Sequence, residues 1–291
     1  MKATLAIIEL FRPLQWIKNI VVLAAIFFSG MLLQPQYLLP SLTAFILFCL
    51  ISSAIYCIND IADLVSDREH PIKKRRPLAS GRLSTSTAMI CSLVLIAVSL
   101  SSAFLFDIKL FMVLGAYFLL NCLYSFFLKT IVLVDIFCIA FAFLLRILAG
   151  SWAIDIEPSQ WFILCTFMLS LYLGFCKRYS ELIVTSTHEI KPRKVLTKYS
   201  PIFLQILIGA CMSATLITYG LYTVSERTME VHHTSRFIYS FPIVAFGLFR
   251  YTYLILYLKG FGEDTARDLI KDIQLIATVV VYIASIFVLI V

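Results

Sequence analysis

The sequence is poor in charged residues. Asp, Glu, Lys and Arg make up only 14% of its 291 residues, whereas 61% are apolar. A soluble domain is normally about one quarter charged and close to half apolar. The composition therefore excludes a soluble globular enzyme, a disordered chain and a coiled coil. What it leaves open is how many times the chain crosses a membrane.

The usual signals of a zinc or disulfide site are also missing. None of the eight cysteines forms a CxxC pair, and the four histidines lie far from them in the sequence. We therefore interpret the cysteines as small apolar helix residues. No basic run alternates with stacking aromatics, so nucleic acid is not an expected partner. A cleavable signal is not expected either, because no small-residue cleavage site follows the first apolar run.

Apolar runs long enough to cross a bilayer, about 20 residues each, occur nine times. They are continuous and lack the alternation of β-barrel strands, so the sequence predicts an all-α polytopic membrane protein with about nine transmembrane helices. No linker-like stretch separates them, and we expect one integral membrane domain over residues 1–291. The runs are 17–34, 40–58, 84–106, 110–128, 131–150, 160–176, 201–223, 237–258 and 272–291.

Basic residues are divided unequally between the two membrane faces. Of the 24 Lys and Arg residues, 19 lie in the N-terminal segment and in every second link after it. Only Lys109, Arg227 and Arg236 lie on the opposite face, and Arg146 and Arg250 lie within runs. Because basic loops stay in the cytoplasm, we expect a multi-pass protein of the inner (plasma) membrane. Its N-terminus would be cytoplasmic, its C-terminus external, and its active site open to the cytoplasmic face.

The richest polar segment is the end of the second run, with Asn59, Asp60, Asp63 and Asp67. If the helix continues to Asp67, then Asn59, Asp63 and Asp67 recur every four residues on one face, with Asp60 a third of a turn aside. Stacked carboxylates repel one another and resist desolvation near a membrane, so a cation would offset their charge. Oxygen-only ligands favour a hard ion, Mg²⁺ or Mn²⁺.

Basic residues follow these acids at once. One interpretation is a cytoplasmic loop whose bases merely pair with the acids. The other is a metal site for a phosphorylated substrate, whose remaining phosphate oxygens the bases neutralise. The single helical face of the acids favours the second interpretation. The bases are Arg68, Lys73, Lys74, Arg75, Arg76 and Arg82.

The order NDxxDxxxD followed by HPxKxxRPLxxG, from Asn59 to Gly81, resembles the hallmark of the UbiA-type intramembrane prenyltransferases. The nine-span count is similar to that of this superfamily as well. The resemblance implies a UbiA-like helical bundle with its active site at these acids, and a motif this long and ordered is a specific signal.

Two branches of this superfamily differ after the sixth helix. The aromatic prenyltransferases have a second acidic motif there, and the two motifs hold two Mg²⁺ on a prenyl diphosphate. Here that link offers Glu181 and Glu189 among bases. The segments RPLQWIKN from Arg12, SQWF at 159–162 and KRYSEL at 177–182 instead resemble the decaprenyl-phosphate phosphoribosyltransferases.

That branch transfers 5-phosphoribose from phosphoribosyl pyrophosphate (PRPP) to a polyprenyl (decaprenyl or undecaprenyl) monophosphate. Pyrophosphate is released, and the product is a lipid-linked ribose donor for cell-envelope glycan synthesis. The resemblance implies that Asp63 and Asp67, helped by Asn59 and Asp60, hold Mg²⁺ on the leaving group. A homo-oligomer is compatible with it. The implied substrate-binding residues are Lys18, Asn19, Arg68, Lys73, Arg76, Tyr124, Lys129, Asp135, Lys177, Arg178 and Glu181.

Some of these residues also have a structural interpretation. Lys18 and Lys129 can be helix-end lysines whose stems lie along lipid, and Lys177 can pair with Glu181 at i,i+4. A carboxylate inside an apolar run, as at Asp135, favours function. Arg146 lies 11 residues further along the same run, on nearly the same face, and we interpret it as pairing between helices.

Two other functions stay open. Transfer of a prenyl group from a prenyl diphosphate to an aromatic acceptor would use the same first motif. A transporter or lipid carrier would favour helices broken by glycine or proline near the middle of the membrane. The runs contain few glycines, and the acids gather at one membrane face.

Overall fold

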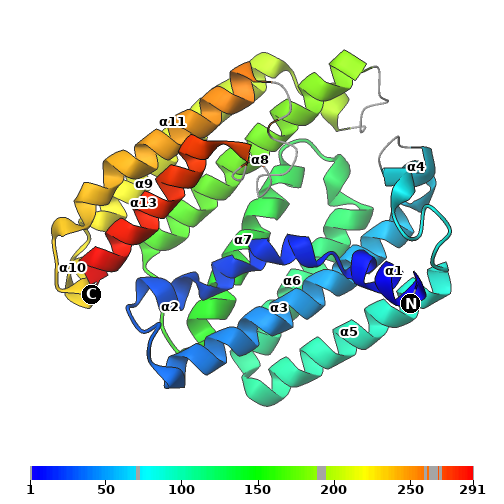
Figure 1. Cartoon of the computed structure of the whole chain (residues 1–291), viewed down its shortest axis with the longest axis horizontal. Helices are drawn as coiled ribbons and strands as arrows, with labels where there is room; N and C mark the ends of the chain where they lie inside the picture. Colours follow the sequence, from blue (N-terminus) through cyan, green and yellow to red (C-terminus); the bar gives the residue numbers. More distant parts are fainter. Residues whose placement is uncertain are drawn as a thin grey trace. The chain divides into compact units, whose positions relative to one another are not determined.

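The computed structural model describes residues 2–69, 73–188, 195–258, 261, 268 and 271–290 (Figure 1). Every regular element in these ranges is a helix, which confirms the all-α prediction. The chain forms two compact units, Met1–Leu128 with Leu145–Glu157, and Lys129–Leu144 with Pro158–Val291.

The first unit begins with three short helices, α1 (Lys2–Phe11), the 3₁₀ helix η1 (Pro13–Leu23) and α2 (Ala24–Phe28). Between α1 and η1, Arg12 has a left-handed backbone with φ 53°. Proline suits the first position of a helix but cannot continue the preceding one. The chain accordingly bends by 40° at Pro13.

The centre of the first unit is α3 (Pro35–Ala62), which packs against η1, α5 (Thr85–Phe106) and α6 (Ile108–Phe126). In the most apolar stretch of α3, 56% of the residues are buried, against 17% for α5. Figure 1 shows α3 and α5 running side by side. The outward face of α5 is thus left for lipid, as expected of a helix in a bilayer.

A single residue, Asp107, joins α5 to α6. It ends α5, and its Oδ1 accepts a hydrogen bond of 2.9 Å from the backbone N–H of Leu110 in the first turn of α6. A carboxylate at this position satisfies a donor that the helix itself cannot. Two further short helices follow α3 in this unit, α4 (Leu64–Glu69) and η2 (Lys73–Arg75).

The second unit is built on the pair α8 (Gln160–His188) and α9 (Pro201–Thr223), which pack along their lengths. Tyr172 and Phe175 of α8 and Leu204 and Ile208 of α9 are buried in its apolar core. The helix α7 (Val134–Ala153) contributes residues to both units. The remaining helices of the second unit are η4 (Leu196–Lys198), α10 (Glu226–His232), η5 (Arg236–Ser240), α11 (Phe241–Tyr257) and α13 (Ile273–Ile290).

The predicted count of nine spans is not confirmed. Within the described ranges, seven helices are long and apolar enough to cross a membrane, or eight if the bent pair Thr4–Phe11 and Pro13–Phe28 is one span. The first predicted run, 17–34, is wrong as a straight helix: the helical part begins at Pro13, ends at Phe28 and is largely 3₁₀. The ninth run is α13, whose apolar stretch Ile273–Val288 is shorter than the others.

Contacts within the first unit show which helix ends lie on the same side of that unit. Lys109, at the start of α6, contacts Asp155 after α7 at 3.1 Å. Asn59 near the end of α3 accepts a hydrogen bond from Ser125 near the end of α6. Both pairings agree with the alternation predicted from the basic residues, in which α3 and α6 run in the same direction.

Candidate active site

The predicted continuous acidic helix is wrong, because the helix breaks within the motif. α3 ends at Ala62, and Asp63 leaves helical geometry with φ −95° and ψ 6°. The next helix, α4, starts at Leu64. The backbone bonds still follow the helical pattern, from Asp63 N–H to the Asn59 carbonyl at 2.9 Å and from Asp67 N–H to the Asp63 carbonyl at 2.8 Å. The acids therefore stay close in space but do not form one straight row.

Asp60 and Asp67 are joined by arginines. Arg76 donates from Nη1 to Asp67 Oδ2 at 2.5 Å and to Asp60 Oδ1 at 3.2 Å. Arg12 donates to the same Asp60 oxygen. Both carboxylates are nearly inaccessible, with 2% and 3% of their surface exposed, whereas about a quarter of each arginine side chain is accessible. The two arginines thus offset the repulsion between the carboxylates. The sequence had predicted that a metal ion would do so.

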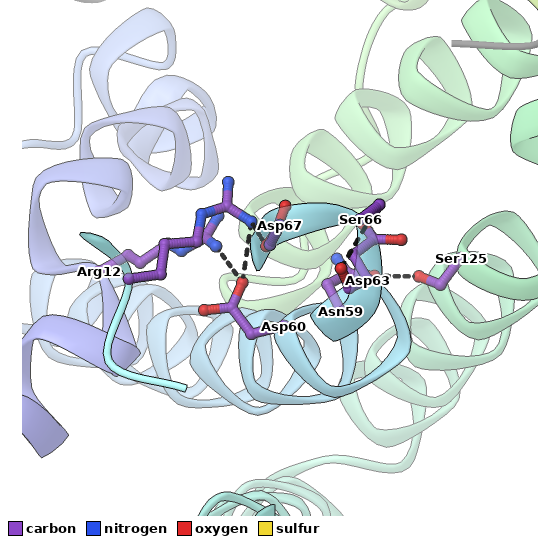
Figure 2. Close-up of polar contacts among 8 residues, drawn as sticks. Arg12, Asn59, Asp60, Asp63, Ser66, Asp67 and Ser125 are labelled. Atoms are coloured by element: carbon purple, nitrogen blue, oxygen red, sulfur yellow. Dashed lines mark hydrogen bonds and ion pairs between the residues drawn. The ribbon is translucent and has the colours of Figure 1, made fainter. Parts of the chain in front are cut away.

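The other members of the motif point elsewhere. Figure 2 shows Asn59 directed toward Ser125 of α6, while Asp60 is directed toward Arg12. The backbone carbonyl of Asp63 accepts from the Ser66 hydroxyl at 2.9 Å. Asp60 and Asp67 therefore face the arginines, whereas Asn59, on the same helix as Asp60, faces α6.

The oxygen donors of the acidic motif, Asn59, Asp60, Asp63 and Asp67, are the candidate ligands for a divalent ion. Among the described residues, no three His, Cys, Asp or Glu side chains are arranged to hold a metal. Mg²⁺, however, usually takes one or two carboxylates and completes its shell with water and substrate phosphate. The motif offers oxygen donors only, and the buried Asp60 Oδ2 has no hydrogen-bond partner. These observations fit a hard ion that shares its ligands with a phosphorylated substrate.

Four further predicted binding residues lie in the first unit at varied exposure. Lys73 opens η2 and is half-buried, as are Lys18 of η1 and Tyr124 of α6. Arg68, near the end of α4, is exposed. Arg76, another predicted base, directly contacts Asp60 and Asp67 of the acidic motif.

Asn19 lies in a buried polar network. Its Oδ1 accepts from Arg146 Nε at 2.9 Å, and its Nδ2 donates to Cys49 Sγ at 3.4 Å. Arg146 also donates to the Tyr117 hydroxyl at 2.7 Å, with its guanidinium over the Tyr117 ring. The prediction that Arg146 pairs between helices is confirmed. A direct contact of Asn19 with substrate stays a prediction.

Close packing accompanies this network. A Cβ on Gly150, one turn after Arg146, would lie 1.8 Å from the Val22 carbonyl oxygen of η1. Only glycine allows the backbones of α7 and η1 to approach so closely. Gly150 and Arg146 therefore both fix η1, which carries Lys18 and Asn19, in its place within the first unit.

In the second unit, the predicted residues Asp135 and Arg178 bind each other. Arg178 Nε donates to Asp135 Oδ2 at 2.6 Å, and both side chains are essentially inaccessible, at 1% and 0%. Tyr199 donates to the other Asp135 oxygen at 2.9 Å and accepts from the Leu133 backbone N–H at 2.7 Å. Burial raises the pKa of Tyr199 above its usual range, so its hydroxyl keeps the proton that it donates.

Glu181 also contacts Arg178, from its Oε2 to Nη1 at 2.6 Å. Arg178 and Glu181 are three residues apart on the helix. The sequence had instead predicted a pair between Glu181 and Lys177, four residues apart. Lys177 and Lys129 are both half-buried in this unit. The buried pair Asp135 and Arg178 and the half-buried Glu181 therefore form one cluster, and their contact with substrate stays a prediction.

Two residues were missing from the predicted site. Arg12 was predicted only as part of the basic N-terminal segment and of the RPLQWIKN resemblance, and Ser125 was not among the predicted site residues, yet they contact Asp60 and Asn59. A buried Asp60 needs a counter-ion, and an arginine directly before Pro13 was the available signal. The motif residues 70–72, together with Glu189, Lys191, Arg193, Lys194, Lys259 and Arg267, lie outside the described residues.

Comparison with known proteins gives consistent matches. The sequence profile described as the UbiA prenyltransferase family matches residues 20–253. A decaprenyl-phosphate phosphoribosyltransferase of Corynebacterium glutamicum is 36% identical over 219 residues, which cover 74% of this chain and 66% of that protein. One of the same name from Mycolicibacterium smegmatis is 35% identical over 224 residues, covering 76% and 70%. The chain thus spans about two thirds of the length of these relatives.

Among solved structures, a UbiA homolog from Archaeoglobus fulgidus bound to DMAPP and Mg²⁺ has a TM-score of 0.71. The match covers 98% of both chains at 20% identity. Similarity at this level of identity establishes the shared helical fold.

Proposed function

Because the chain belongs to the UbiA prenyltransferase family, as its motifs predicted, we propose that it is a polyprenyl-phosphate phosphoribosyltransferase. It transfers 5-phosphoribose from PRPP to a polyprenyl monophosphate in the bilayer and releases pyrophosphate. The observation that carries this choice is the 36% and 35% identity to relatives that bear the name of this activity. The product would be a lipid-linked ribose for cell-envelope glycans.

The acidic helix end supports a phosphate-rich substrate. Two arginines, Arg12 and Arg76, lie against buried carboxylates with about a quarter of each side chain accessible. Arginine is well suited to bind phosphate oxygens through two parallel hydrogen bonds. Lys18, Arg68 and Lys73 add positive charge in the same unit, which would offset the repulsion between two anionic substrates.

The reaction needs little acid–base chemistry from the protein. An oxygen of the lipid phosphate attacks C1 of the ribose, the bond from C1 to the pyrophosphate oxygen breaks, and C1 is inverted. The lipid phosphate is already an anion, so no strong base is required. Asn59, Asp60, Asp63 and Asp67 would hold Mg²⁺, which would neutralise the departing pyrophosphate oxygens.

A labelling assay tests the proposal. Purified protein is incubated with Mg²⁺, polyprenyl phosphate and PRPP labelled in the ribose, and the lipid is extracted. We expect labelled lipid and an equal amount of pyrophosphate. In the competing reaction, a prenyl diphosphate and an aromatic acceptor replace these substrates. Prenylated aromatic product without any labelled lipid would overturn the proposal and leave the family assignment standing.

We also propose an orientation in the plasma membrane, with the acidic helix end at the cytoplasmic face and Val291 outside. The support is the unequal distribution of Lys and Arg residues between the two faces. Reporter fusions test it: a fluorescent protein fused after residue 190 should fluoresce, whereas alkaline phosphatase at that position should be inactive. Active phosphatase there would contradict the orientation.

A further inference from the structure

A further ion pair in the first unit joins α1 to the segment Lys73–Arg82, which we call the basic loop. Glu9, near the end of α1, accepts from both terminal nitrogens of Arg82, at 2.6 Å and 2.9 Å. The residues are 73 positions apart in the sequence. Each side chain is about half exposed. The two parallel bonds give this contact a defined geometry that a single surface ion pair lacks.

Arg82 also holds the basic loop together internally. The same Nη2 donates to the Arg75 carbonyl at 2.7 Å, and Nε donates to the Ser80 hydroxyl at 3.1 Å. Ser80 in turn donates to the Arg76 carbonyl at 2.7 Å. Gly81, with φ +75°, provides the turn that brings Arg82 back over these groups. Arg82 therefore connects Glu9 to the backbone of Arg75 and, through Ser80, to that of Arg76.

The residue that follows α1 contacts the acidic motif itself. Arg12, three residues after Glu9, donates its backbone N–H to the Glu9 carbonyl at 3.3 Å and its side chain to Asp60. Its left-handed backbone lies outside the helical geometry of α1. One short helix thus contacts both the carboxylates and the basic loop that supplies Arg76.

Apolar packing fixes the position of α1 in this arrangement. Ala6 and Leu10 are buried, at 1% and 0% exposure, in a cluster with Leu78 and Leu83. Leu78 lies in the basic loop, and Leu83 directly follows it. Glu9 lies between the two buried positions along α1, so it is held in place to meet Arg82.

We propose that Glu9 is a positioning residue: through Arg82 it holds the basic loop so that Arg76 lies against Asp60 and Asp67. Its kinetic consequence rests on the proposed function, because Arg76 would then meet the phosphates of PRPP. Loss of the Glu9 carboxylate should loosen the loop without removing any group that touches substrate.

The test compares Glu9→Gln with the matched control Asp155→Asn, which removes one charge from the surface pair Lys109–Asp155 of the same unit. Intact protein in detergent is digested briefly with trypsin, and the fragments are identified by mass. Cleavage after Lys74 and Arg75 should be about threefold to fivefold faster in Glu9→Gln, consistent with loss of a well-formed surface ion pair. The control should be cleaved like the wild type.

A double-mutant cycle separates the pair from a general loss of stability. In an Arg82→Gln background, Glu9→Gln should add nothing to the cleavage rate. The KM for PRPP should rise about threefold to fivefold in Glu9→Gln, while the KM for polyprenyl phosphate stays unchanged, since uniform binding is lost. Glu9→Asp should recover part of both effects.

Wild-type cleavage rates in Glu9→Gln, or independent effects of the two substitutions, would overturn the positioning role. If the wild type makes no labelled lipid from PRPP, the proposed function fails. The cleavage measurements still decide whether Glu9 holds the loop.

Discussion

Asp67→Asn is expected to lower kcat/KM for phosphoribosyl transfer by at least ~100-fold, above the range that loss of an outer-shell partner costs. Asp67 is buried and accepts from Arg76 at 2.5 Å. The amide oxygen of asparagine can still accept that bond, so the loop keeps its anchor. What is lost is the negative charge that would attract Mg²⁺. Asp63→Asn should give a loss of the same kind.

The matched control for this substitution is Glu69→Gln. Glu69 is the last residue of α4, is exposed, and undergoes the same change of charge only two positions away. Its activity should remain close to that of the wild type. EDTA should stop the wild-type reaction, and Mg²⁺ should restore it. If Asp67→Asn transfers phosphoribose at the wild-type rate with saturating metal, the carboxylate is only an ion-pair partner of Arg76.

Arg178→Ala is expected to destabilise the protein by about 3–5 kcal/mol, the usual cost of removing one partner of a buried ion pair. The substitution leaves the Asp135 carboxylate without its guanidinium in a site with no exposed surface. Tyr199 would remain as a donor but carries no charge to compensate it. Unfolding in mixed detergent micelles, followed by circular dichroism, measures the loss.

Two variants make this result interpretable. Arg250→Ala removes an arginine from the more exposed pair Arg250–Asp272 of the same unit. It should lower the free energy of unfolding by less than Arg178→Ala does. Asp135→Leu combined with Arg178→Met removes both charges and should recover most of the stability, because a packed apolar pair often replaces a buried ion pair without loss. If Arg178→Ala is as stable as Arg250→Ala yet fails to transfer phosphoribose, Arg178 binds substrate, as the sequence predicted.

The long helices could be predicted from composition alone, because about 20 apolar residues in a row have few other solutions. The runs 84–106 and 201–223 differ from α5 and α9 by at most a residue. The first run failed because hydropathy does not report the backbone change at Pro13. The apolar run predicts an α-helix, whereas η1 is a 3₁₀ helix of 11 residues.

The motif grouped the acidic residues of the candidate site, but it did not indicate their partners. The motif identified Asn59, Asp60, Asp63 and Asp67, but Arg12 lies 48 residues from Asp60 and no spacing rule connects them. Local rules named only Lys177 as a partner of Glu181, although i,i+3 and i,i+4 contacts are nearly equivalent on a helix. Arg178, which binds Asp135, also contacts Glu181.

The 3₁₀ winding of η1 determines how far a short segment can reach. A 3₁₀ helix rises about 2.0 Å per residue, against about 1.5 Å for an α-helix. The 16 residues Pro13–Phe28 would span only about 24 Å if they were entirely α-helical. With η1 wound as it is, they reach about 30 Å. Rewinding η1 as an α-helix would shorten the segment by about 5 Å, enough to pull the Arg12 guanidinium off Asp60.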